Sequence, residues 1–200
     1  YCFVGLGLVE LFKLTGDMAL LEWARELWEA VLSRFRDVEG GGFFETPADS
    51  EPLLLRQKAF FDAATPSGNG AAALLGLWLC RYYGRNDWEL QAEEVAGQVA
   101  DHLLRTVAGF GTILQVIEFL ATPGRELVIV GPPERRVAFE DAAATRFLPW
   151  TAIAPTPDAD GLPMCEGREP TGDTALAYVC ENMMCLMPAR TPEELAALLG

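Results

Sequence analysis

Polar side chains that could bind a ligand or act in catalysis gather just before an apolar run in the middle of the chain. Arg56, Lys58 and Asp62 come first, and the segment TPSGN at residues 65–69 then leads into apolar residues 71–79. Thr65 and Pro66 are expected to cap and open a helix, whose free N–H groups can receive an anion or a polar ligand. The predicted ligand site comprises Arg56, Lys58, Asp62, Thr65, Ser67 and Asn69. The alternative is that Thr65 simply caps a buried helix.

A glycine-rich loop precedes this segment, with Gly40, Gly41 and Gly42 followed by Phe43, Phe44 and Glu45. Two aromatic rings after a tight turn can lie against the flat face of a sugar, so both rings join the candidate ligand site. A plain turn packed by these rings is the alternative. Glu45 and Asp62 are candidate catalytic residues, because two carboxylates can act as acid and base on a glycosidic bond. The alternative is that these two carboxylates form ion pairs with the nearby basic residues. Both an enzyme and a binding module fit the sequence.

The five cysteines show no metal-binding pattern. Cys180 and Cys185 have four residues between them, which is neither C-x-x-C nor a zinc spacing. They are interpreted either as buried thiols or as a redox pair. His102, the only histidine, falls near the end of a helix expected to face outward, which is a poor place for a general base. We therefore expect no metal and no cofactor.

Composition narrows the classes of partner. The 200-residue chain carries a net charge of −14, which argues against binding to nucleic acid. No apolar run reaches the ~20 residues that span a bilayer, so no membrane partner is expected. The chain opens in what resembles the middle of a helix, without an initial Met or a basic leader. The expectation is a fragment of a cytoplasmic protein that lacks its N-terminal part.

Helical periodicity repeats over residues 1–122. An apolar stretch at 3–14 and an amphipathic stretch at 17–35 recur at 71–83 and 88–104, when Gly16 is aligned with Gly84. A third apolar helix is expected over residues 110–120. Alternation of fully buried and half-buried helices is typical of an α/α toroid. The sequence therefore predicts a mostly α fold, in which a partial α/α toroid of helical hairpins occupies residues 1–122.

From residue 123 the pattern changes to short β-branched runs. Strands are expected over residues 125–131, 151–154 and 174–180. A helix over residues 135–147 would join the first two in a right-handed parallel unit. Residues 155–173 are predicted to be loop, and Thr191 and Pro192 to open a final helix. Residues 123–200 are thus expected to form a small α/β segment with a short parallel sheet, packed on the helical part.

In this order, these pieces resemble the C-terminal part of the YyaL-like thioredoxin-domain proteins, the family related to spermatogenesis-associated protein 20. The most specific segments are TPSGN at 65–69 and YVC at 178–180, with GGFF at 41–44 and LVIVG at 127–131 in support. The resemblance implies a six-hairpin, glycosidase-like toroid, similar to that of the N-acylglucosamine epimerases. It also implies an N-terminal thioredoxin-like domain and upstream hairpins that lie outside this chain, as partners of it. The resemblance does not assign a catalytic residue to this sequence.

Two functions remain open. In the first, the toroid binds or processes a carbohydrate-like small molecule in its central cavity. In the second, the chain is a non-catalytic scaffold or client-binding module that serves the thioredoxin-like redox domain. Disulfide exchange between that domain and the pair Cys180 and Cys185 is a third, related hypothesis.

Overall fold

The computed structural model describes residues 1–51, 54–103, 105–158, 161–170, 172–182 and 184–200. The chain divides into two compact units. Unit 1 consists of residues 1–9, 19–80 and 85–121, and unit 2 of residues 10–18, 81–84 and 122–200. Leu104, the predicted end of a helix, and residues 159, 160 and 171 of the predicted loop lie outside the described residues.

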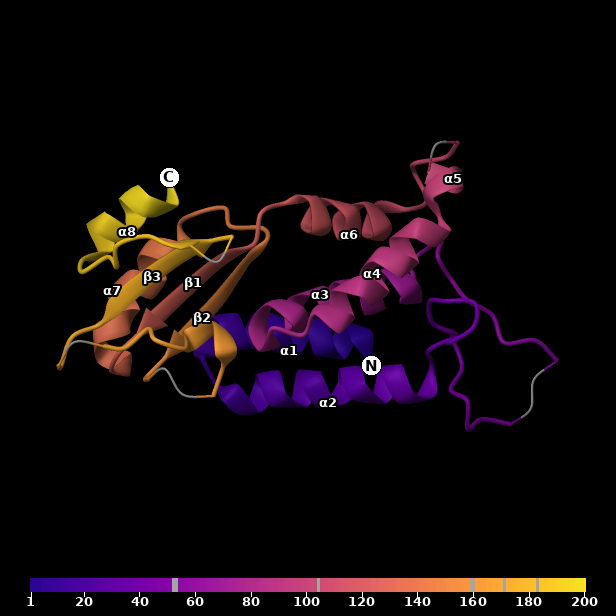
Figure 1. Ribbon diagram of the computed structural model, residues 1–200, viewed down its shortest axis with the longest axis horizontal. Coiled ribbons are helices and arrows are strands. Elements are labelled where there is room, and N and C mark those ends of the chain that lie inside the picture. Colours follow the sequence, from indigo (N-terminus) through magenta and orange to yellow (C-terminus); the bar gives the residue numbers. More distant parts are fainter. Residues whose placement is uncertain (52–53, 104, 159–160, 171, 183) are drawn as a thin grey trace. The chain divides into compact units, whose positions relative to one another are not determined.

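Helices form most of unit 1 (Figure 1). They are α1 (Cys2–Thr15), α2 (Met18–Arg34), α3 (Gly68–Tyr83), α4 (Asn86–Gln98), α5 (Ala100–Leu103) and α6 (Gly111–Ala121), of which α1, α2 and α3 extend into unit 2. The predicted helices at 3–14, 17–35, 71–83 and 110–120 are confirmed. The helix predicted over 88–104 is instead divided at Val99 into α4 and α5. None of the helices in the described ranges is long and apolar enough to cross a membrane.

Helix α3 lies at the centre of unit 1. Residues 69–80 are all buried, which confirms the prediction of a helix without a solvent-facing side. Small residues let its neighbours approach closely, since a Cβ on Gly76 would lie 2.9 Å from the Trp28 ring of α2. The Trp28 ring in turn contacts the rings of Phe43 and Trp88. The helix that begins at the candidate site is thus fixed by tight packing.

The predicted fold class is wrong in two respects. The described residues of unit 1 do not show an α/α toroid, and α6 is not the all-round buried helix that such a ring needs. Ile113, Val116 and Phe119 are buried along one side of α6, whereas Leu114 and Ile117 are 37% and 36% exposed. A repeated pair of apolar and amphipathic helices indicates how neighbouring helices pack, but it does not indicate that they close into a ring.

The second difference from the predicted fold class lies in unit 2, which contains a mixed sheet in the strand order β2-β1-β3-β4. The strands are β1 (Arg125–Val130), β2 (Thr151–Thr156), β3 (Leu176–Glu181) and β4 (Met184–Cys185). β1 and β2 are parallel and joined through α7 (Pro133–Ala144), which confirms the predicted crossover. β3 runs antiparallel to β1, and β4 antiparallel to β3, so the prediction of a parallel sheet is wrong. Periodicity marks a strand without giving its direction.

The two faces of this sheet have different surroundings. Leu127 of β1 lies in an apolar cluster with Phe139 of α7 and Leu195 of α8 (Pro192–Leu199). Figure 1 labels α7 and α8 beside β1 and β3. Because side chains alternate along a strand, Glu126 points to the opposite face. On β3, Cys180 is the partner of Glu126 across the antiparallel ladder and therefore shares that face.

Candidate functional site

The glycine-rich loop of residues 37–45 turns tightly and lies against the start of α3. The N–H of Asp37 donates to the Gly42 carbonyl, and the N–H of Gly41 donates to the Asp37 carbonyl. Gly41 and Gly42 both have φ of 70°, in the region that favours glycine. A Cβ on Gly42 would also lie 2.7 Å from Oδ1 of Asn69. Both the turn and the close approach therefore require glycine.

Asn69 fixes this loop to α3. The side chain is buried, with 1% exposure. Its Oδ1 accepts the N–H of Phe43 at 2.7 Å, and its Nδ2 donates to the carbonyls of Phe43 and Ala59, each at 2.9 Å. Both amide hydrogens are used, so Asn69 acts as a structural link at the wall of the site.

Lys58 holds the glycine turn from its other side. Its Nζ lies 2.6 Å from Oδ2 of Asp37 and donates to the Gly41 carbonyl. Hydrogen bonds from the Gly40 N–H first, and then from Lys58, lower the pKa of Asp37 to about 2. The turn is thus stabilised by a charged pair whose carboxylate stays ionised at neutral pH.

Arg56 supports the aromatic part of the loop. Its guanidinium donates to the carbonyls of Thr46 and Arg34, the latter at 3.3 Å. The same group lies 4.0 Å from the centre of the Phe44 ring, and Nζ of Lys58 lies 5.1 Å from it. Two cations beside one ring attract its negative face and hold Phe44 in place.

Asp62 links the starts of two helices. Its Oδ1 accepts the N–H of Ser67 at 2.8 Å, ahead of α3, and its Oδ2 accepts the N–H of Thr112 at 2.7 Å in α6. Burial alone would raise the pKa of Asp62, but these N–H bonds outweigh burial and the pKa is lowered. Both carboxylate oxygens serve the fold in this arrangement.

Ser67, rather than Thr65, caps α3. The helix begins at Gly68, and the Ser67 hydroxyl accepts the N–H of Gly70 at 3.2 Å. Thr65 lies outside the helix and is exposed, so the prediction that it caps the helix is wrong. Two nearby residues can each cap a helix, and Asp62 sets the choice between them because it binds the N–H of Ser67.

A pocket of about 330 Å³ lies in unit 1 beside the loop. Its lining residues are Tyr1, Cys2, Phe3, Val31, Phe35, Phe43, Phe44, Glu45, Thr65, Pro66, Gly68, Asn69, Ala71 and Ala72. The structure thus brings together five of the predicted site residues, namely Phe43, Phe44, Glu45, Thr65 and Asn69. Arg56, Lys58, Asp62 and Ser67 are not part of this lining and support it through the loop and the helix start.

Glu45, Thr65 and Tyr1 are the exposed polar side chains of the pocket lining, and the Tyr1 hydroxyl already accepts a hydrogen bond from Arg34. Within the described residues, the Glu45 carboxylate has no hydrogen-bond or ion-pair partner, while its backbone N–H donates to the Gln57 carbonyl. Because Asp62 lies outside the lining, the structure does not bring the two predicted carboxylates to one pocket. The lining offers aromatic faces, one carboxylate and the hydroxyls of Thr65 and Tyr1, which suit binding of a neutral polar molecule.

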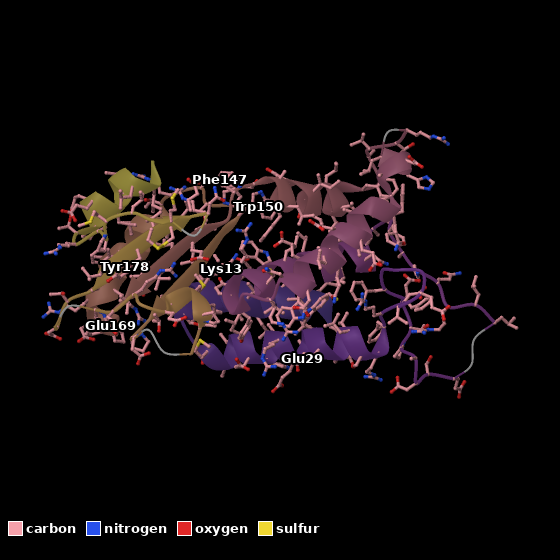
Figure 2. All side chains as sticks on the ribbon, viewed as in Figure 1. Lys13, Glu29, Phe147, Trp150, Glu169 and Tyr178 are labelled. Carbon is pink, nitrogen blue, oxygen red and sulfur yellow. A yellow bond between two sulfur atoms is a disulfide. The ribbon has the colours of Figure 1, made fainter. Side chains whose placement is uncertain are left out.

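Sequence reasoning missed a second pocket, of about 520 Å³, in unit 2. Lys13 lines it, with its side chain 10% exposed and its Nζ 2.6 Å from Glu10. Burial lowers the pKa of Lys13, although the hydrogen bond to Glu10 opposes that effect. Figure 2 labels Lys13 together with Phe147, another lining residue. The sequence feature that could have indicated this pocket is Lys13, the one lysine in the apolar stretch 3–14.

Cys180 and Cys185 form a disulfide between β3 and β4, with their Cα atoms 3.9 Å apart. Nη2 of Arg168 lies 3.1 Å and 3.3 Å from the two sulfurs and 2.8 Å from Oε2 of Glu126. Arg168 and Glu126 carried no signal in the sequence, because they are 42 residues apart. In the described part of the chain, no three His, Cys, Asp or Glu side chains gather as a metal site would require.

The whole chain is similar to spermatogenesis-associated protein 20. The human, mouse and rat proteins of that name are each 28% identical to it over 211 residues. Each alignment covers 100% of this chain and 26% of the relative, so the chain spans about a quarter of the length of the curated relatives it matches. No protein-family model matches the chain. The similarity supports the relationship to that family which the sequence motifs indicate.

Proposed function

We propose that unit 1 binds a small, neutral, sugar-like molecule in the pocket beside the glycine-rich loop. The observation that carries the proposal is the composition of one wall, where Phe43, Phe44 and Glu45 follow one another along the loop and all line the pocket. The volume of about 330 Å³ lies at the lower end of the range for pockets that hold small ligands. It suits a ligand of one or two sugar rings.

The aromatic lining supports stacking. Phe44 is half-buried and lines the pocket, while Arg56 and Lys58 hold its ring in position. A fixed ring loses little entropy when a ligand packs on it, and preorganisation of this kind favours affinity. The C–H face of a sugar ring is an apolar surface that such a ring can contact.

The polar lining supports recognition of hydroxyl groups. The Glu45 carboxylate can accept hydrogen bonds from two hydroxyls, and Thr65 can donate or accept one. Neither lysine nor arginine is among the described lining residues, and the chain carries a net charge of −14. Both facts disfavour an anionic ligand, so a neutral polyol matches the site best. The proposal is one of binding, with Glu45 as an acceptor.

Titration calorimetry with a panel of neutral mono- and disaccharides tests this function. We expect saturable binding with a Kd on the order of 1 mM or tighter, and a loss of at least about tenfold in Glu45→Gln and in Phe44→Leu. Glu39→Gln is the matched control, because Glu39 is exposed on the same loop and outside the pocket lining. Equal affinity in all four proteins, or no binding by any sugar, would refute the proposal.

Exposed apolar side chains favour a second candidate, a non-catalytic client-binding module. Leu55 and Phe61, in the segment that joins α2 to α3, are 72% and 57% exposed. Such side chains can contact apolar segments of an unfolded protein. If this is the function, Leu55→Ser combined with Phe61→Ser weakens binding to a reduced, unfolded test protein, while sugar binding is unchanged. Unchanged binding of the test protein would reject this candidate.

A further inference from the structure

We propose that Cys180 and Cys185 are a redox-active pair that exchanges with external thiols, with Arg168 stabilising the thiolate that leaves. This site lies in unit 2 and is independent of the sugar-like ligand proposed for unit 1. Three features of the described residues support it, which are the register of the strands, the unequal exposure of the two sulfurs and the position of one guanidinium.

The register keeps the two cysteines opposite each other. Cys180 and Cys185 are direct partners in the β3–β4 ladder. In the neighbouring pair, farther from the turn, the N–H of Leu186 donates a hydrogen bond to the Val179 carbonyl. The two cysteines therefore form a non-hydrogen-bonded pair, in which side chains approach most closely. Asn182, with φ of 51°, lies in the tight turn between the strands. The hairpin thus holds both sulfurs together after reduction, ready to form the bond again.

The two sulfurs differ in access. Cys180 lies on a buried strand position, with 1% exposure, whereas Cys185 is exposed on the edge strand β4. An external thiolate must approach along the S–S axis from the accessible side. It therefore attacks Sγ of Cys185, and Cys180 is the leaving group.

Arg168 supplies the charge that this leaving group needs. Its Nη2 lies 3.1 Å from Sγ of Cys180, and its side chain is only 12% exposed. A cation beside a sulfur favours the thiolate over the thiol, and a better leaving thiolate speeds exchange. Glu126, at 2.8 Å from the same Nη2, positions the guanidinium and offsets part of its charge.

The exchange balances as a two-electron transfer. The external thiolate forms a bond to Sγ of Cys185, the Cys180–Cys185 bond breaks, and its electron pair goes to Cys180 beside Arg168. A second external thiolate then attacks the external sulfur of this mixed disulfide and releases Cys185 as a thiolate. Both cysteines take up the protons that the two external thiols gave to water. The protein disulfide is reduced, and the external thiols are oxidised to a disulfide.

The remaining cysteines are poor competitors. Burial raises the pKa of Cys165 to about 11, against the opposing effect of Arg168, and burial likewise raises the pKa of Cys2 to about 11. Cys80 is buried. Since the thiolate is the reactive form, Cys165 and Cys2 stay largely unreactive at neutral pH, and burial limits access to Cys80. The exposed edge of the hairpin is then the expected point of exchange.

The test measures the rate at which the native oxidised chain is reduced, by quenched differential alkylation and mass spectrometry. One arm uses glutathione and the other uses reduced thioredoxin, which distinguishes a low-molecular-weight thiol from a protein dithiol. Reduction in either arm supports the proposal. Reduction in neither arm without denaturant overturns it.

Variants separate charge stabilisation from simple loosening of the hairpin. We expect Arg168→Gln to slow reduction about tenfold, Arg168→Lys to restore part of the rate, and Glu126→Gln to increase the rate. Arg135→Gln is the matched control, because Arg135 is an exposed arginine of the same unit that lies on α7 and pairs with Asp173, and this change should leave the rate unchanged. If Arg168→Gln and Glu126→Gln both speed reduction, Arg168 is only structural and the proposal fails.

Variants that keep one cysteine of the pair test the direction of attack. Cys180→Ser leaves Cys185, which should form a mixed disulfide with oxidised glutathione at least about tenfold faster than Cys180 does in Cys185→Ser. Equal rates, or a faster Cys180, would contradict the assignment of Cys185 as the attacked sulfur.

Discussion

Asn69 binds both backbone groups of Phe43. Its Oδ1 accepts the Phe43 N–H at 2.7 Å, and its Nδ2 donates to the Phe43 carbonyl at 2.9 Å, much as a neighbouring strand would. The pair is 26 residues apart in sequence and joins the first turn of α3 to the loop that carries Phe44 and Glu45. The shape of the pocket in unit 1 therefore depends on one buried carboxamide.

Asn69→Ala should destabilise the chain by about 2–4 kcal/mol, because it leaves buried backbone groups of Phe43 and Ala59 without partners. The free energy of unfolding in urea measures this. Gln98→Ala is the control, since Gln98 makes one exposed hydrogen bond to the Gly40 carbonyl of the same loop and should cost well under about 1 kcal/mol. Similar costs for the two variants would show that Asn69 does not fix the loop.

Asp62 should show a graded effect, because each of its oxygens binds one helix start. Asp62→Ala loses both interactions and should cost about 2 kcal/mol, whereas Asp62→Asn keeps one acceptor oxygen and should cost about half as much. Urea unfolding at neutral pH gives both values. If the two variants lose equal stability, the double link between α3 and α6 is not the reason for the presence of Asp62.

The lowered pKa of Asp37 should make the stability of the folded chain depend on pH. Its pKa in the folded chain is lowered to about 2 from an ordinary value of 3.8. The unfolded chain thus binds the proton more readily, so the contribution of Asp37 is complete above about pH 4 and is lost as the pH falls through about 2. Asp37→Asn should lower the urea midpoint at pH 6, and the difference from the parent chain should shrink below pH 4. A difference that is constant from pH 6 to pH 3 would contradict this linkage.

Periodicity predicted most elements because the spacing of apolar residues reflects which positions are buried. The all-apolar residues 71–79 lie in a helix that is buried on every side, and the apolar residues 127–130, three of them β-branched, lie in a strand with both faces covered. The same information did not give the direction of β3, the two-residue strand β4 or the arrangement of helices in unit 1. Those depend on contacts between segments far apart in the chain.

The sequence predicted the position of the candidate site better than it predicted the roles of the residues in it. Asn69, Asp62 and Lys58 were singled out as polar residues near a helix start, and the structure places all three around that start. Their partners are backbone groups and a carboxylate supplied by other segments, such as Thr112 for Asp62, 50 residues away. A sequence shows that a polar group is present, but it does not show which distant group satisfies it. Glu45, which has no such partner among the described residues, is the one that carries the functional proposal.

The most direct test of that proposal is a titration of the ¹⁵N-labelled chain with the best-binding neutral sugar, followed by two-dimensional NMR. We predict saturable, coupled shifts of the backbone amides of Phe44, Glu45 and Thr65, which need at least about tenfold more sugar to saturate in Glu45→Gln, while the rest of the spectrum stays native. Amides of unit 2 should not move. Shifts confined to other residues, or saturation at the same sugar concentration in the Glu45→Gln variant, would contradict the assignment of this pocket as the ligand site.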